Sequence, residues 1–387
     1  MGVIIGMDPH KRSATIDVID ERARVLAAGR YGTDKAGYAE MLRAGRKFED
    51  RVWAVEGCNG VGRHIAHRLV ASGETVLDVP AKLSAQVRVF ATGNGRKTDS
   101  VDAHSVALAA LRSPRLVQVE VSPDLLVLGM LADRRDELGR ARTQTINRIH
   151  RLLLELIPGG AKQFLSAAQA RALLATTKPR DIVGKTRRRL AAELITELEA
   201  IDRKIRACKK EITALVRAQG STLLQLHGIG PSSAARLLAD VGDIHRFVSR
   251  DHFASWNGTA PLDASSGQQL RHRLSRAGNR RINRALHIMA VAQLRNATEG
   301  RAYYDARKAA GKTSMEAMRC LKRRLSNVVY RQMLYDQDNR QVTGPGGHSG
   351  TTLKSSVTDL TPDIGSSDKP LPGPAAPQPR TPVRAAS

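Results

Sequence analysis

Short apolar runs alternate with polar turns in the first third of the chain. The runs at 3–7, 14–19 and 24–31 are short strand candidates, and turn-like polar clusters separate them. Further along, apolar positions spaced by three and four residues indicate helices that alternate with more strands. We therefore expect helices near 35–44, 61–71 and 99–111, and strands at 52–55 and 75–79.

Three consecutive strands followed by alternating helices and strands match the element order of ribonuclease-H-like domains. We therefore expect an α/β domain of this type over residues 1–118. The rest of the chain has mainly helical patterns, so the fold class expected for the whole molecule is α/β plus all-α.

Residues 119–217 are helical and charged in pattern, with scarcely any strand signal. The positions of a seven-residue repeat are Leu131, Leu138, Thr145 and Leu152, and Pro158 ends this first helix. In the second helix, apolar steps of three and four form a seam of coiled-coil type. We expect two long coiled-coil arms that pair with each other or with another subunit. The seam residues are Leu198, Ile201, Ile205, Cys208, Ile212 and Leu215.

Residues 218–337 read as a further, mainly helical domain. A glycine-containing turn at 226–230 precedes a helix at 232–241, and a basic amphipathic helix at 315–335 closes the region. Residues 338–387 are rich in Gly, Ser, Pro and Thr and have few apolar clusters, so we expect a disordered tail there.

The chain is strongly basic. Its 62 Lys and Arg against 37 Asp and Glu give a formal charge of +25, which favours polyanions and points to nucleic acid. No segment approaches the ~20 apolar residues of a membrane span, and the N-terminus lacks a signal-peptide pattern. The three cysteines are far apart, without the spacing of a zinc site or disulfide framework. We therefore expect a cytoplasmic protein.

Four acidic residues carry the candidate chemistry. Asp8 and Glu56 each follow a short apolar run, and Asp99 and Asp102 lie three apart on one face of an expected helix. Each acid alone is most simply a solvated charge, but the joint arrangement favours a shared metal site. Carboxylate oxygens suit Mg²⁺ or Mn²⁺. The basic neighbours are expected to be phosphate contacts or plain surface and not ligands: His10, Lys11 and His104.

The turn Leu226-His227-Gly228-Ile229-Gly230 resembles the turn of a helix-hairpin-helix motif. Glycines allow the backbone to approach a phosphate, and the following helix N-terminus offers N–H groups to an anion. An ordinary glycine turn between packed helices explains the same residues equally well. Gly228 and Gly230 are therefore candidate nucleic-acid contacts with a structural alternative.

A basic, serine-containing stretch at 264–281 is the second informative feature. The simplest interpretation is a flexible loop that binds phosphates. The alternative is a serine nucleophile beside a glycine, with arginines that stabilise charge on a phosphorane. Sequence alone does not choose between Ser265, Ser266 and Ser275. The candidate phosphate-binding arginines are Arg271, Arg273, Arg276 and Arg280.

Taken together, residues 3–337 resemble an insertion-sequence transposase of the serine-dependent class with an acidic tetrad, a family of bridge-RNA-guided recombinases. Several motifs occur in the family's order, and together they are highly specific. They are Gly6-Met7-Asp8-Pro9-His10-Lys11, Val55-Glu56-Gly57, Lys97-Thr98-Asp99-Ser100-Val101-Asp102-Ala103, His227-Gly228-Ile229-Gly230, Ala260-Pro261, Ser266-Gly267 and Arg276-Ala277-Gly278-Asn279-Arg280.

The resemblance implies an N-terminal domain like a Holliday-junction resolvase, in which Asp8, Glu56, Asp99 and Asp102 hold Mg²⁺. It also implies that Ser266 attacks DNA and becomes covalently linked to it. Donor and target DNA, a non-coding guide RNA and a homodimer or tetramer with shared active sites are the partners that it implies. The arms would then carry RNA binding and dimer contacts.

Three functions remain to be distinguished. The first is a recombinase that uses Ser266 and the metal-bound acids. The second is a metal-dependent, junction-resolving nuclease in which water attacks and no protein–DNA adduct forms. The third is a basic architectural protein that binds nucleic acid without chemistry, with an affinity that depends on salt and not on divalent metal.

Overall fold

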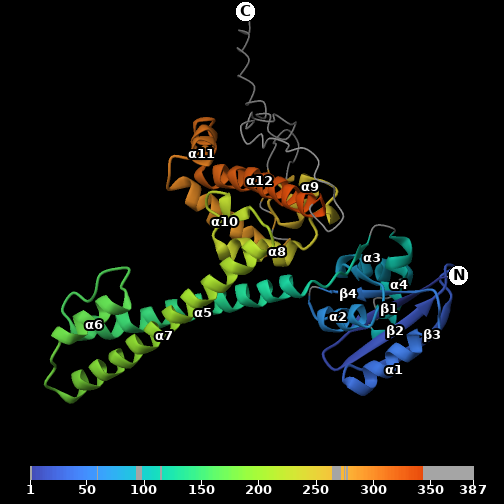
Figure 1. The fold of residues 1–387 in the computed structure, drawn as a ribbon, viewed down its shortest axis with the longest axis horizontal. Helices are drawn as coiled ribbons and strands as arrows, with labels where there is room; N and C mark the ends of the chain where they lie inside the picture. Colours follow the sequence, from blue (N-terminus) through green and yellow to red (C-terminus); the bar gives the residue numbers. More distant parts are fainter. Residues whose placement is uncertain are drawn as a thin grey trace, which may run out of the picture. The chain divides into compact units, whose positions relative to one another are not determined.

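The computed structural model describes residues 2–58, 60–92, 98–113, 116–263, 272–273, 275 and 278–342 (Figure 1). The N-terminal elements are β1 (Val3–Pro9), β2 (Ser13–Ile19), β3 (Val25–Gly32), α1 (Lys35–Gly45), β4 (Arg51–Glu56), α2 (Arg63–Ala71), β5 (Val76–Val79), α3 (Ala81–Thr92), α4 (Asp99–Arg112) and β6 (Val117–Gln118). The later elements are α5 (Pro123–Leu156), α6 (Ala167–Thr176), α7 (Ile182–Ala218), α8 (Pro231–Val241), α9 (Arg250–Trp256), β7 (Leu262–Asp263), β8 (His272–Arg273), α10 (Arg280–Leu294), α11 (Glu299–Ala309) and α12 (Ser314–Val342), with short 3₁₀ turns at Leu223–Gln225 and Ile244–Arg246.

The N-terminal domain is a mixed α/β domain built on a six-stranded sheet. The strand order is β3-β2-β1-β4-β5-β6. β1, β2 and β3 pair antiparallel, β1–β4 and β4–β5 pair parallel, and β6 returns antiparallel on β5. The three-strand meander followed by parallel strands is the ribonuclease-H-like arrangement that the sequence predicts.

Successive side chains of the central strands pack into two different cores, one on each face of the sheet. Side chains two apart on a strand share a face. Ile5 and Met7 of β1 pack into one core with Trp53 of β4 and with α1 and α2. Ala54 of β4 packs on the other face with α4 and α3. The residues next in step on that second face, Asp8 and Glu56, therefore lie on the α4 side of the sheet.

Gly6 allows α4 to lie directly on β1. A Cβ atom at this position would lie 2.4 Å from the carbonyl oxygen of Ala103 and 2.6 Å from the Cβ of Ala107. Both alanines belong to α4 and are fully buried. The backbone of α4 thus approaches the strand more closely than any side chain at residue 6 would permit.

A buried carboxylate ties the strand β4 to the loops beside it. The Glu74 side chain is only 2% exposed and accepts hydrogen bonds from Arg51, Arg46 and Trp53 at 2.7 to 3.0 Å. Burial alone would raise the pKa of Glu74, but the hydrogen bonds from these three donors lower it to about 2. This cluster is a structural ion network around a buried carboxylate, and Arg46 at its edge is half exposed.

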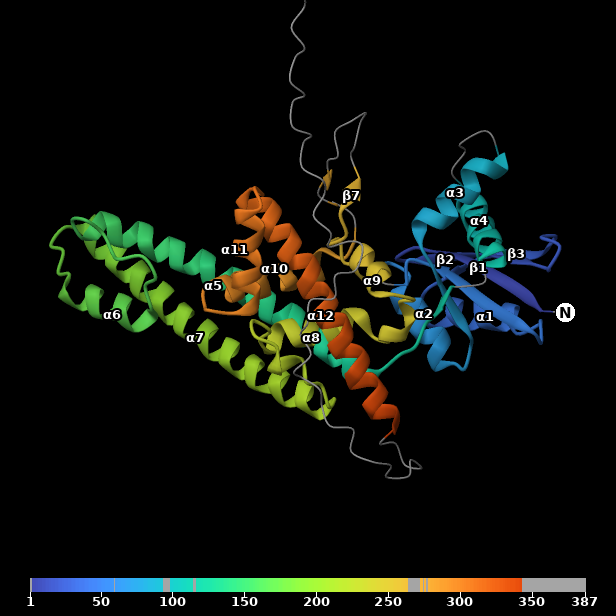
Figure 2. The ribbon, with the colours of Figure 1, turned by 90° about the horizontal axis from the view of Figure 1, so that it is seen from above.

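The long helices α5 and α7 run antiparallel and side by side (Figures 1 and 2). Arg142 of α5 donates to Asp202 of α7 at 2.7 Å, and the Cys208 thiol lies 3.4 Å from the carbonyl oxygen of Leu131. The predicted seam residues Leu198, Cys208 and Ile212 are buried. The short helix α6 closes the far end of the pair over a core that includes Leu153, Leu174 and Ile195.

The remaining helices share one core with the near ends of α5 and α7. Leu128 of α5 and Val216 of α7 pack with apolar residues of α8, α9, α10 and α12. Phe247, Phe253 and Trp256 form an aromatic cluster there, with ring centroids 5.1 to 5.9 Å apart. α12 extends to Val342, so the first residues of the predicted disordered tail are helical, and residues 343–387 lie outside the described range.

Two short strands, β7 and β8, pair antiparallel and flank residues 264–271. The sequence predicts only a basic loop at this position. Among the helices that the structure describes, none combines the length and apolar character needed to cross a membrane.

Candidate active site

The sheet register brings the first two acids onto neighbouring strands. In the parallel pair β1–β4, Met7 lies opposite Val55, so Asp8 and Glu56 follow at the same end of adjacent strands. Asp8 is buried, with a side chain 12% exposed, and Glu56 is half-buried. Their common end of the sheet is the first part of the candidate site.

The first turn of α4 supplies the other two acids. Thr98 caps this helix by accepting a hydrogen bond from the backbone N–H of Val101, and Asp99 and Asp102 follow in the first turn. Carboxylates at a helix N-terminus are favoured by the helix dipole. Asp102 is 6% exposed and faces the sheet, whereas Asp99 is 36% exposed. Because α4 lies on Gly6, this turn is held beside the end of β1.

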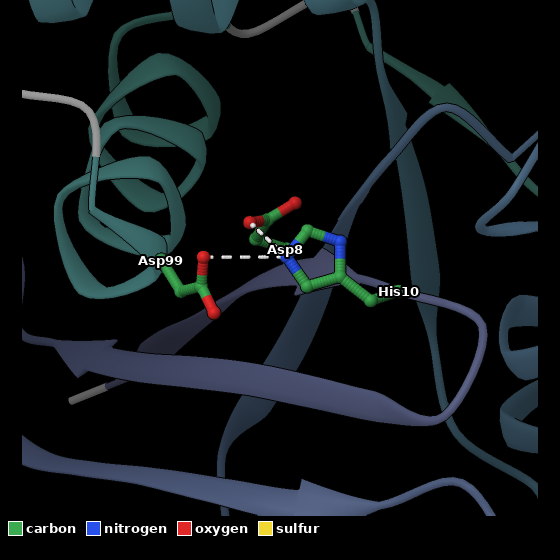
Figure 3. A group of neighbouring side chains, drawn as sticks. All are labelled: Asp8, His10 and Asp99. Carbon is green, nitrogen blue, oxygen red and sulfur yellow. Dashed lines mark ion pairs between the residues drawn. The ribbon is translucent and has the colours of Figure 1, made fainter.

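His10 lies between two of the acids. Its Nε2 atom is 3.5 Å from Asp8 and 3.3 Å from Asp99 (Figure 3). One donor atom from each of these three residues lies within 4.8 Å of the others, a spacing that one metal ion can bridge. The sequence predicts His10 to be a phosphate contact or plain surface, and the structure places it inside the acid cluster.

Glu56 is electrostatically coupled to the cluster. Burial raises its pKa, and the neighbouring carboxylates of Asp8 and Asp102 raise it further, against a hydrogen bond from Ser84 and the charge of Arg88. Two carboxylates act on Glu56 from different elements, β1 and α4. The structure thus groups Asp8 with His10 and Asp99, whereas Glu56 and Asp102 are related to this group by the effect of Asp8 and Asp102 on the pKa of Glu56.

Two arginines neutralise part of this negative charge. Arg88 of α3 pairs with Asp102, and Arg30 of β3 lies 2.9 Å from Asp99. The sequence does not predict either arginine, because both lie on elements that carry none of the four acids. His104 has a different role from the phosphate contact expected, since its Nδ1 lies 2.6 Å from the buried Asp17 and fixes α4 to β2.

The donor set fits a hard divalent cation. Four carboxylates supply the oxygen ligands that Mg²⁺ and Mn²⁺ prefer. Their mutual repulsion, visible in the raised pKa of Glu56, is the kind of cost that a bound cation relieves. The residues at this end of the sheet can therefore hold a metal ion and present it to a phosphate.

The two candidate glycines of the C-terminal part have different surroundings. Gly228 has a φ of +91°, and a Cβ there would lie 2.8 Å from the carbonyl oxygen of Met289 in α10. Packing between helices therefore explains this glycine. Gly230 is the N-cap of α8 with open space where its Cβ would be, so the start of α8 is accessible to a ligand.

The basic stretch is only partly described. Arg273 and Arg280 are exposed, as phosphate contacts must be. Ser275 is 6% exposed, and its carbonyl oxygen accepts from Arg280 at 3.5 Å, so its hydroxyl is shielded from a large substrate. The other candidates lie outside the described residues: Ser265, Ser266, Arg271 and Arg276.

The end of this stretch is fixed by an ion network that the sequence did not reveal. Asn279 caps α10 and donates to Asp240 of α8 at 3.0 Å. Arg236, with a side chain 6% exposed, lies 2.7 Å from Asp133 of α5 and 3.7 Å from Asp240. Residues from α5, α8 and α10 thus set the point where the basic stretch enters α10.

Comparisons with known proteins agree with these motifs. A family model described as "Transposase IS116/IS110/IS902 family" matches residues 220–305, and a DEDD model of the IS110 type, described as "Transposase", matches residues 5–158. The "Probable family 20 transposase" of Pseudomonas aeruginosa is 31% identical over 273 residues, which are 69% of this chain and 76% of that protein. The "Insertion element IS116 uncharacterized 44.8 kDa protein" of Streptomyces clavuligerus is 25% identical over 86% of this chain and 94% of that protein.

Among solved structures, "T. thermophilus RuvC in complex with Holliday junction substrate" covers 31% of this chain and 100% of its own, at 18% identity and a TM-score of 0.25. The four acids lie within the range of the DEDD model, and Gly228, Gly230 and the arginines lie within that of the other. From these matches the chain belongs to the IS116/IS110/IS902 family of transposases and is a DNA transposase.

Proposed function

We propose that this transposase cuts and rejoins DNA with Ser266 as nucleophile and with Mg²⁺ or Mn²⁺ held by Asp8, Glu56, Asp99 and Asp102. One observation supports the metal site: donor atoms of Asp8, His10 and Asp99 lie within 4.8 Å of one another, and the charges of Asp8 and Asp102 also act on the half-buried Glu56. Isolated surface acids do not couple in this way, because solvent screens them. The half of the proposal that concerns Ser266 rests on the motif and on the basic residues that flank it.

The reaction proposed is a transesterification. The Ser266 Oγ attacks phosphorus, a DNA oxygen leaves, and the serine proton passes to the departing oxygen, so one phosphodiester replaces another. Attack by the hydroxyl of a second strand then reverses the step and releases Ser266. A cation held by the four acids would stabilise charge on the phosphate and on the departing oxygen. Arg273 and Arg280 would contact phosphate oxygens of the substrate.

The proposed partners follow from the charge and the motifs. Donor and target DNA are the substrates, a non-coding guide RNA selects them, and a homodimer or tetramer completes the active site. A formal charge of +25 supports binding to more than one nucleic acid strand. The antiparallel pair α5–α7, which projects two long exposed faces, supplies surface for RNA and for a second copy.

A denaturing gel that detects a covalent protein–DNA adduct tests the nucleophile. Labelled donor and target DNA, the RNA encoded beside the gene and Mg²⁺ are incubated with wild type, Ser266→Ala or the matched control Ser265→Ala. We expect the adduct in wild type and in Ser265→Ala, and its absence in Ser266→Ala. Cleavage without any adduct would instead indicate a hydrolytic, junction-resolving nuclease.

The same assay tests the acids. Asp102→Asn removes one charge from the cluster while keeping the size of the side chain. Metal catalysis is worth several kcal/mol and 1.36 kcal/mol is tenfold in rate, so we expect strand exchange to fall by at least about 100-fold. Binding of DNA should be unchanged. Strand exchange at the wild-type rate would refute the shared metal site.

A further inference from the structure

An open pocket with a mixed polar and apolar lining lies at the C-terminal end of α5, far along the chain from the acid cluster. Its volume is about 690 Å³, and it is formed by one face of α5 and the segment that leads into α6. Figure 2 shows this segment and α6 beside the ends of α5 and α7. Side chains of several chemical kinds line the cavity, among them Arg142, Asn147, His150, Gln163 and Phe164.

Phe164 is held outward by its own backbone. Its side chain is 88% exposed, although phenylalanine is normally buried. Its φ of 67° lies in the left-handed region that residues other than glycine avoid. The next residue, Leu165, is 5% exposed in the core beneath α6. The left-handed turn therefore anchors Leu165 and presents an aromatic ring at the surface, in a chain whose aromatic content is only 3%.

The polar groups around this ring match the edges of a nucleobase. The amides of Asn147 and Gln163 can donate and accept together, as recognition of a base edge requires. His150 adds a further donor. The charge of Arg142 is offset by Asp202, which lies 2.7 Å from its guanidinium. Proteins that recognise unpaired bases combine such groups with an aromatic platform.

The charge of the cavity fits a polyanion. Among the residues that the structure describes, no Asp or Glu lines the cavity. Lys162, next to Gln163, is exposed, and the whole chain carries +25. An apolar protein partner would instead favour a lining without amides, imidazole and guanidinium groups, because each would lose water on docking.

We propose that this cavity binds an unpaired base of single-stranded nucleic acid, with Phe164 as the stacking platform and Asn147 and Gln163 at the base edge. This proposal rests on the proposed function in one respect. The strand bound in the cell would be part of the RNA or DNA on which the transposase acts. Binding of a base here needs neither metal nor serine. The Asp102→Asn protein should therefore bind as well as wild type.

The test measures what one side chain adds to binding of a base. A fluorescent single-stranded RNA of about 12 nucleotides, a length within the usual footprint of such sites, is compared with its abasic counterpart by anisotropy. The full-length protein is used as wild type, Phe164→Ala, Phe164→Leu and Phe164→Trp. Val248→Ala, which shortens another exposed apolar side chain in a different region, is the matched control.

We expect wild type and Phe164→Trp to prefer the base-bearing strand. Stacking on an aromatic ring is worth about 1–3 kcal/mol per base, so that preference should fall by about 5- to 150-fold in Phe164→Ala and in Phe164→Leu. The introduced Trp should also lose fluorescence when the strand binds. The Val248→Ala control and Asp102→Asn should keep the full preference.

Three results would overturn the proposal. An unchanged preference in Phe164→Ala would show that the ring does not stack on a base. Full binding by Phe164→Leu with a loss only in Phe164→Ala would show that apolar area matters and the aromatic face does not. A change in oligomeric state without a change in RNA binding, measured by light scattering, would assign the surface to a second protein copy instead.

Discussion

At the scale of single residues, the surroundings of Glu56 and its proposed role as a metal ligand favour opposite protonation states. Burial and the charges of Asp8 and Asp102 all disfavour its ionised form, yet a metal ligand must be ionised. A carboxylate kept in such a place costs the fold free energy when no cation is present. Active sites commonly retain residues that lower stability in return for function.

We therefore predict that Glu56→Gln stabilises the metal-free protein and weakens its response to metal. The neutral amide removes repulsion with Asp8 and Asp102, so Tm in chelator should rise by a few degrees, about 1 kcal/mol. The rise in Tm on adding Mn²⁺ should shrink or vanish. Thermal scans with and without Mn²⁺ measure both effects. Glu40→Gln, an exposed acid on α1, should change neither.

Glu74 shows the opposite behaviour, because its charge is compensated. Its pKa of about 2 lies below the ordinary value of 4.5, so its contribution to stability is present above pH 4.5 and is lost as pH falls towards 2. Removing one partner of a buried ion network costs about 3–5 kcal/mol. We predict a loss of that size for Glu74→Gln in urea unfolding at neutral pH.

The pH dependence provides the check. The difference between wild type and Glu74→Gln should narrow as pH falls from 4.5, because the wild-type carboxylate becomes protonated. A constant difference across that range would contradict the ion network. The exposed Glu40→Gln variant again serves as control, and it should differ little from wild type at every pH.

The acids could be predicted from the sequence, but their immediate partners could not. Asp8 and Glu56 end apolar runs, and Asp99 and Asp102 share a helical face, so local patterns mark them. Arg30 and Arg88 reach the site from β3 and α3, and only the tertiary fold shows which acid each one meets. An ion pair between residues of two different elements produces no periodic pattern in the sequence.

At the scale of elements, the packing of α4 on β1 places Asp99 beside Asp8. The contact depends on Gly6, where even a methyl group would overlap the α4 backbone. α4 carries Asp99 and Asp102, and β1 carries Asp8, so a shift of the helix separates the ligands. Sub-ångström placement of metal ligands is what catalysis requires.

We predict that Gly6→Ala impairs both folding and metal binding. Overpacking of a tight core contact costs about 1–3 kcal/mol, and displacement of α4 should weaken Mn²⁺ binding, measured by calorimetry, by about 10-fold or more. Gly2→Ala is the matched control, because a Cβ there meets nothing closer than 3.8 Å. Wild-type affinity in Gly6→Ala would show that α4 does not position the acids.

Strands and helices with clear periodicity were predicted closely, and those without it were not. The buried strands β1, β2 and β4 have dense apolar runs. α3 was missed because Val87-Arg88-Val89 alternates with a period of two, which is typical of a strand. β6 consists of two exposed residues, Val117 and Gln118, and only its pairing with β5 identifies it.

At the scale of the whole molecule, charge governs encounter with nucleic acid. The excess of 25 positive charges is spread over the chain, so phosphate contacts should contribute most of the affinity for DNA. Such binding needs no catalytic group. It should therefore be separable from strand exchange.

We predict a steep dependence of DNA affinity on salt. For 6–10 phosphate contacts the affinity should fall by about 10³- to 10⁵-fold between about 50 and 200 mM salt. Wild type and Asp102→Asn should give the same slope in filter binding or anisotropy, with and without Mg²⁺. A DNA affinity that does not change with salt would contradict an interface driven by charge. A slope that changes with Mg²⁺ would show that the metal takes part in DNA binding.

The arginines beside the acids have a practical consequence. Because Arg88 and Arg30 already offset Asp102 and Asp99, the N-terminal sheet does not rely on an added cation to form. A chelator would then abolish strand exchange without unfolding the protein, and addition of the ion would restore strand exchange. If the proposed metal site holds, abundance of this transposase in a cell would follow the stability of its fold, whereas its activity would follow the supply of the divalent cation.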